Sequence, residues 1–153
     1  AATFTGHMHN DDFRLLSAAD GSDAAALVRV APGISPVFDS NPGYQIYSYD
    51  TQTFALIDET TYVLDLAATA PAWSLEYDYA ATYGQTLATP QEWQAAYAGI
   101  LTNPVSQTAY LTYKNQDAVA QSSITAANAS IYLLAPGFVT PESYNAAAAV
   151  LVG

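Results

Sequence analysis

Alternation of apolar and polar residues marks the first half of the chain and predicts strands. The run 44–49 alternates strictly between two faces, with aromatic and β-branched residues among its members. After a turn over 50–53, the runs 54–59 and 61–66 are again rich in strand-forming residues. Because side chains in a strand point alternately to opposite faces, we expect these runs to form an antiparallel meander.

Strand patterns also occur nearer the start of the chain. Residues 4–9 read as a short core strand, and the runs 13–16 and 26–30 flank a turn signal at 20–23, which predicts a hairpin. The segment 31–42 contains three prolines and one glycine and predicts irregular structure.

The apolar period changes to the helical one after Pro71. An apolar stripe over 73–83 predicts a helix that ends in a left-handed cap at Gly84. The segment 89–92 is a capping box with proline at the first helical position, and an amphipathic face follows through Leu101. A short helix is expected over residues 105–113.

From residue 116 on, the chain is poor in charge and rich in Ala, Ser and Thr. Residues 130–134 predict a strand or a helical turn that Pro136 ends, and the segment 140–142 begins a last helix. Such a helix must pack on this chain or on a partner, which leaves self-association open.

Together these patterns predict an α+β fold in three parts. Residues 1–70 would hold the strands, residues 71–115 a small helical carboxy-terminal subdomain, and residues 116–153 the tail with its final helix. A length of 153 residues is enough for a hydrophobic core.

Charge is strongly unbalanced, with 14 acidic residues against Arg14, Arg29 and Lys114. A net charge of −11 repels nucleic acids and anionic membrane surfaces, which excludes sequence-independent binding to either. Basic partners are scarce, so neighbouring acids such as Asp58 with Glu59, or Glu76 with Asp78, are expected on a solvated surface.

The two histidines of the chain, His7 and His9, stand two residues apart after a predicted strand end. If the backbone stays extended between them, the imidazoles point to the same side and suit Zn²⁺, Fe or Mn²⁺. They could share one ion or serve two ions about 3.5–4 Å apart. Asp11 and Asp12 could accept hydrogen bonds that fix the imidazole tautomers. The alternative is a set of polar residues that only ends a strand.

The phrase Gly-His-Met-His-Asn-Asp-Asp-Phe-Arg at residues 6–14 resembles the last metal-ligand motif of the acid sphingomyelinase-like phosphodiesterases. These belong to the calcineurin-like metallophosphoesterases. The Asn-Pro-Gly-Tyr segment at 41–44 is the most specific further match, and order and spacing follow the family over about residues 3–114. The other matching segments are 31–36, 45–47, 59–66, 73–77, 82–84 and 89–93.

The resemblance implies the terminal strands of a metallophosphoesterase β-sandwich and a two-metal centre, usually of zinc, in which His7 binds one ion and His9 the other. It also implies a phosphodiester substrate. The family's remaining ligands and its general acid lie upstream and include further histidines, which this chain lacks. The chain therefore resembles only the carboxy-terminal part, with no catalytic residue of its own. Completion by the amino-terminal part of the same precursor, or by a partner chain, is expected.

In the resembled family the loop at 31–42 borders the substrate cleft. This would place Ile34, Val37, Phe38 and Asp39 near the bound phosphodiester. On the residues alone, a proline-rich connector without ligand contact explains the segment equally well.

Scarce lysine with abundant Asp, Thr, Ser and Tyr suits an extracellular, secreted protein. The family's secreted members usually carry disulfides, whereas this chain has no cysteine. The sequon at 128–130 would make Asn128 an N-glycosylation site if the chain is secreted. No apolar run is long enough for a transmembrane helix. The start lacks the features of a signal peptide and suggests a chain cut from a longer one.

Two other functions are compatible with the same residues. One is a structural or self-assembling extracellular module that keeps the fold without catalysis. The missing metal ligands and the uncharged tail support this function. The other is a carbohydrate-binding module that uses exposed tyrosines. The 12 tyrosines of the chain support this function.

Overall fold

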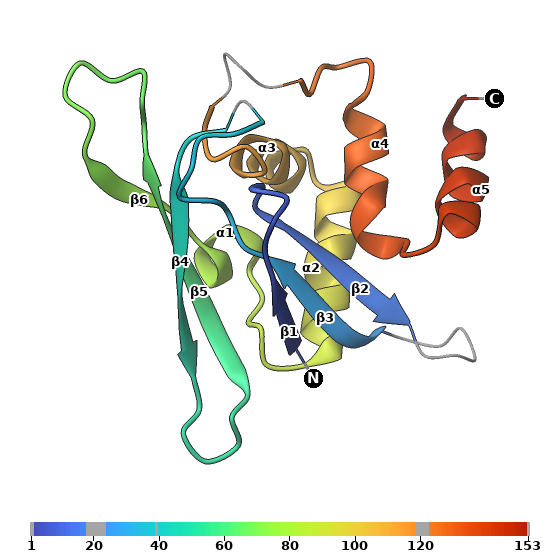
Figure 1. Ribbon diagram of the computed structural model, residues 1–153. Helices are drawn as coiled ribbons and strands as arrows, with labels where there is room; N and C mark the ends of the chain where they lie inside the picture. Colours follow the sequence, from blue (N-terminus) through green and yellow to red (C-terminus); the bar gives the residue numbers. More distant parts are fainter. Residues whose placement is uncertain (1, 18–23, 39, 119–122, 153) are drawn as a thin grey trace.

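The computed structural model describes residues 2–17, 24–38, 40–118 and 123–152. Strands come first and helices follow, which confirms the α+β class (Figure 1). In order, the elements are β1 (Ala2–Thr5), β2 (Asp12–Ser17), β3 (Ala24–Val30), β4 (Gly43–Tyr49), β5 (Leu56–Leu64), β6 (Trp73–Asp78), α1 (Tyr79–Tyr83), α2 (Pro90–Thr102), α3 (Pro104–Tyr113), α4 (Ala129–Leu134), the 3₁₀ turn η1 (Ala135–Gly137) and α5 (Pro141–Val152).

The first sheet has three strands in the order β1-β3-β2. β2 and β3 pair antiparallel, as the hairpin pattern predicts, while the turn expected at 20–23 lies outside the described residues. β1 pairs with β3 in parallel. The expected core strand at 4–9 is wrong in length and burial, because β1 ends at Thr5 and is largely exposed.

The second sheet is the predicted antiparallel meander, in the order β4-β5-β6. Two expectations are corrected here. A single strand, β5, replaces the two runs at 54–59 and 61–66, and residues 73–78 form β6 instead of the start of a helix. The apolar spacing of 73–83 fits a helix, but pairing with β5 satisfies the backbone of 73–78 and overrides that local pattern.

One face of the second sheet is buried and the other is open. Glu59, Thr61 and Val63 on β5 face the interior. On the opposite face Ile46, Trp73 and Leu75 are 54%, 43% and 59% exposed. Within the described part of the chain, no element covers this open face (Figure 1).

The end of α1 and the start of α2 lie where local chemistry predicts. α1 ends at Gly84, which adopts a φ of 66° and donates its backbone N–H to Ala80 O at 2.9 Å. α2 starts with the predicted capping box between Thr89 and Glu92. From α2, the side chains of Trp93, Ala96 and Ile100 enter the core, and the helix packs on β3 (Figure 1).

The last elements pack on the rest of this chain. α4 contacts α3, and η1 packs against β2. Tyr97 on α2 donates its hydroxyl to Leu134 O at 3.0 Å, which ties α4 to the core helix. The predicted last helix is present as α5 and packs on α4. Among the described helices, none has the length and apolarity to cross a membrane.

Replacing Thr89 by alanine tests the capping box. The variant loses the side-chain acceptor for Glu92 N–H, so its free energy of unfolding should fall by about 1 kcal/mol in denaturant titration. Thr89→Ser keeps the hydroxyl and should stay within about 0.5 kcal/mol of the parent chain. Equal losses in both variants would contradict a role for the hydroxyl.

Candidate functional site

The histidine pair lies on a tight loop, residues 6–11, called here the histidine loop. The backbone is not extended there, because His7 and His9 adopt φ angles of 79° and 56°. Positive φ is uncommon for a residue with a side chain and indicates a loop fixed by its surroundings. Strand alternation therefore does not bring the two imidazoles to the same side of the chain. His7 is exposed and His9 is half-buried.

Residues 33–38 hold His9 in place. Its Nδ1 lies 3.1 Å from Ser35 O. A carbonyl oxygen only accepts, so this contact requires the proton on Nδ1 and leaves the Nε2 lone pair free to bind a metal. A Cβ on Gly33 would lie 2.1 Å from the same Nδ1, so only glycine fits beside the ring. The Phe38 ring meets the His9 ring edge to face at 6.2 Å.

The loop predicted to border a cleft thus contacts the histidine loop directly. Ile34, Val37 and Phe38 are exposed next to it, at 63%, 40% and 66%. Asp39 lies outside the described residues. Their contact with a substrate stays a prediction.

A buried glutamine supports the histidine loop from below. With the Gln116 amide turned to satisfy its neighbours, its oxygen accepts from Asp11 N at 2.7 Å and its nitrogen donates to His9 O at 3.2 Å. The same nitrogen lies 3.3 Å from Asn41 O, and Asn41 Nδ2 donates to Gln116 O at 2.9 Å. No pattern in the sequence pointed to Gln116. Asn41 belongs to the Asn-Pro-Gly-Tyr segment, which the resemblance singled out.

Asp11 enters a buried ionic cluster. Arg29 Nη2 donates to Asp11 Oδ1 at 2.9 Å and also to Glu59, while Tyr77 donates its hydroxyl to Asp11 Oδ2 at 2.5 Å. Burial raises the pKa of Asp11 to about 7, Arg29 opposes this shift, and Glu59 adds to it. Two carboxyl groups therefore share one guanidinium.

Asp12 anchors the same end of the loop, at the start of β2. It accepts from Lys114 Nζ, from Arg14 Nη1 at 2.8 Å and from the Tyr110 hydroxyl at 2.8 Å. Burial acts to raise the pKa of Asp12, but the charges of Lys114 and Arg14 hold it below its usual value. Both aspartates are thus bound to protein cations, and hydrogen bonds from the imidazoles to these carboxylates stay a prediction.

The expectation that Glu59 is solvated is wrong. Its side chain is 0% exposed and lies against Arg29. The ion pair with Arg29 compensates the loss of hydration that burial imposes on the Glu59 carboxylate.

The chain is similar to known phosphodiesterases over more than half of its length. The chain is 33% identical over 97 residues to human acid sphingomyelinase-like phosphodiesterase 3b, a match that covers 55% of this chain and 21% of the relative. It is 34% identical over 93 residues to human cyclic GMP-AMP phosphodiesterase SMPDL3A, covering 54% and 20%. It is 30% identical over 100 residues to sphingomyelin phosphodiesterase B of Dictyostelium discoideum, covering 58% and 16%.

This chain is related to the acid sphingomyelinase-like phosphodiesterases. It corresponds to the carboxy-terminal part of that family and spans about a fifth of the length of the relatives it matches. No protein-family model matches the chain.

Sphingomyelinase-like phosphodiesterases are a metal-dependent family, so we tested whether the described residues can hold an ion. No group of three or more His, Cys, Asp or Glu side chains is arranged for one in the part of the chain that the structure describes. A catalytic zinc normally takes three protein ligands. His7 and His9 alone fall short of that number, and their role as metal ligands stays a prediction.

The predicted glycosylation site lies at the start of α4. Asn128 is half-buried, and its amide accepts from Thr125 N at 2.6 Å and donates to Ser123 O at 3.0 Å. A glycan on Asn128 would have to replace the hydrogen bond to Ser123, and modification of this residue stays a prediction.

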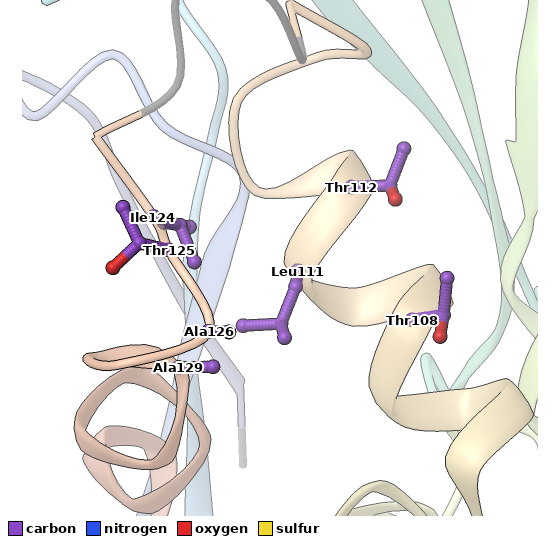
Figure 2. A pocket seen from close by; sticks show the side chains of 7 residues that line it. All are labelled: Thr108, Leu111, Thr112, Ile124, Thr125, Ala126 and Ala129. Carbon is purple, nitrogen blue, oxygen red and sulfur yellow. The ribbon is translucent and has the colours of Figure 1, made fainter.

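A cavity of about 260 Å³ lies between α3 and residues 124–129 (Figure 2). Leu111 points from α3 toward Ala126, and the lining consists of apolar and threonine side chains. Among the described residues, no titratable side chain lines it. The described lining suits an apolar group and holds no acid, base or metal ligand for phosphodiester chemistry.

Glu76 is a second acid that the sequence wrongly places in solvent. Both carboxyl oxygens are buried and make no hydrogen bond within the described structure. Burial raises the pKa of Glu76 to about 10, and the nearby acids Asp11, Asp117 and Glu59 add to the shift. Glu76 is therefore neutral at pH 7, whereas in the unfolded chain it is ionised.

Glu76 should make the folded chain more stable in mild acid than at neutral pH. Its stabilising contribution is complete below the unfolded pKa, about 4.3, and is lost progressively as the pH rises toward 10. Between pH 5 and 8 the free energy of unfolding should fall by up to about 1.4 kcal/mol per pH unit from this group.

Glu76→Gln should flatten that slope and stabilise the chain at pH 7.5, measured by denaturant titration at several pH values. Glu142→Gln, at an exposed position on α5, is the matched control and should leave the slope unchanged. An identical slope for Glu76→Gln and the parent chain would rule out a neutral buried carboxyl.

Proposed function

We propose that this chain is the carboxy-terminal part of a secreted, sphingomyelinase-like phosphodiesterase and supplies two of its metal ligands, His7 and His9. The observation that carries the proposal is the similarity to phosphodiesterases over 54–58% of the chain. The amino-terminal part of the same precursor, or a partner chain, would supply the other ligands and the proton donor.

The state of His9 supports this role. Metal-binding histidines commonly donate the proton of one ring nitrogen to a backbone carbonyl and bind the ion through the other nitrogen. His9 has this arrangement, with Nδ1 held by Ser35 O and the ring fixed against Gly33. His7 is exposed on the same loop and is free to turn toward an ion.

The residues around the pair keep it in position for the reaction. Asp11 and Asp12, bound to Arg29 and Lys114, hold one end of the histidine loop in the core. A zinc pair, when bound, would polarise the phosphoryl oxygen and lower the pKa of a bound water. The exposed side chains of Ile34, Val37 and Phe38 would border the organic part of the phosphodiester.

The open face of the second sheet supports completion by another segment. Ile46, Trp73 and Leu75 form an exposed apolar surface on a sheet whose other face is core. Exposed apolar surface of this kind marks an interface. Because the relatives are about five times longer than the matched stretch, the missing amino-terminal part is the occupant we favour.

The same face supports the second candidate, a self-assembling module without catalysis. Copies of the chain could cover each other's open sheets. Light scattering separates the two: the proposed enzyme part should be monomeric or bound to its amino-terminal part, whereas the module forms oligomers of this chain alone.

Substitution of the histidines tests the metal centre. In the complete assembly, His9→Ala should lower kcat for a phosphodiester by about 10²-fold or more and remove bound zinc, because a ligand is lost. His7→Ala should act likewise. Elemental analysis measures the metal, and the surface variant Val105→Ala serves as the control. Full activity and metal content in His9→Ala would refute the assignment.

A further inference from the structure

A second cavity lies directly beside the histidine loop. Its volume is about 290 Å³, near the lower end of small-molecule sites. Met8 and Asn10 of the loop border it on one side, and residues of α4 and α5 border it on the other. Met8 and Asn10 are the sequence neighbours of His9, so the cavity borders the same loop as the candidate metal ligands.

Two of the three basic residues of the chain line this cavity. Arg14 and Lys114 both bind the single carboxylate of Asp12. One positive charge is therefore in excess, although the whole chain carries −11. About a third of the Arg14 side chain is exposed, whereas Lys114 is buried. An anion entering the cavity meets a positive charge whose position is already fixed.

Apart from Asn10 and Asp12, the remaining lining residues are apolar or aromatic. Ile131 and Tyr132 project from α4, and Tyr144 comes from α5, where its hydroxyl donates to Ile131 O at 3.3 Å. The Lys114 ammonium lies 5.9 Å from the centre of the Tyr132 ring. An aromatic wall beside a cation favours a ligand that combines a ring with a negative charge.

We propose that this cavity binds a small aromatic anion, with its anionic group at Arg14 and Lys114 and its ring between Met8, Ile131 and Tyr132. Charge excess, apolar walls and volume all point to this class. A free inorganic anion would make no contact with the apolar walls. A neutral ring would make no ion pair with Arg14 or Lys114.

The place of this site in catalysis rests on the proposed phosphodiesterase function. A phosphodiester whose leaving group carries both a ring and a further anionic group could span the two sites. It would place its phosphorus at the histidines and its leaving group in the cavity. Binding in the cavity does not itself depend on a metal.

Phenyl phosphate is the probe, titrated into the metal-free 153-residue chain and followed by calorimetry and amide NMR. It should bind at least about tenfold more tightly than inorganic phosphate or phenol, with shifts at Arg14, Tyr132 and Tyr144. Arg14→Gln should weaken binding by about tenfold, and Arg14→Lys should restore most of it.

Ile131→Glu places a like charge on the apolar wall at a surface position and should weaken binding by about tenfold or more, even if Arg14 variants fold poorly. Val105→Glu, exposed on α3, is the matched control and should bind as the parent chain does. The proposal is overturned if phenyl phosphate binds no better than inorganic phosphate, or if Ile131→Glu binds it unchanged.

His9→Ala keeps the two proposals separate. This variant should bind phenyl phosphate as the parent chain does, because the cavity does not use the imidazole. Normal phenyl phosphate binding with no metal in the assembled enzyme would remove the phosphodiesterase proposal alone. Absence of phenyl phosphate binding in a zinc-loaded, active assembly would remove the cavity proposal alone.

Discussion

The buried guanidinium of Arg29 is the contact on which the rest of the structure depends. It joins β3 of the first sheet, through Glu59, to β5 of the second, and through Asp11 to the histidine loop. Removing one partner from such a cluster leaves an uncompensated buried charge, at a cost of about 3–5 kcal/mol. One buried side chain thus links both sheets to the carboxy-terminal end of the histidine loop.

Local chemistry was enough to predict several elements. The capping box of α2, the left-handed Gly84 and the antiparallel meander follow from residue types within a few positions of each other. Residues 73–78 show where this fails: their spacing of Trp and Tyr satisfies a helical stripe, yet a free edge of β5 was available to pair with them. Local periodicity does not report such a non-local partner.

The buried acids show a different limit. Three basic residues among 14 acids suggested that no cation was available for Glu59, but all three cations are used in buried or half-buried contacts with Asp11, Asp12 and Glu59. The few basic residues of the chain are concentrated in the core, where each pairs with acids. The histidine motif was visible in the sequence, whereas the backbone of the histidine loop was not, because its geometry comes from Ser35, Asn41 and Gln116, which are distant along the chain.

The hydrogen bonds of Gln116 have a consequence for how the protein folds. His9 lies near the beginning of the chain, and the amide that fixes its backbone comes after α3. Contacts of such large sequence separation form late, because the entropy of closing the intervening loop must first be offset. During synthesis the two imidazoles would leave the ribosome before Gln116, and their loop would remain unstructured until the third helix is complete. Any ion at these histidines would thus meet an ordered loop only after α3 has formed.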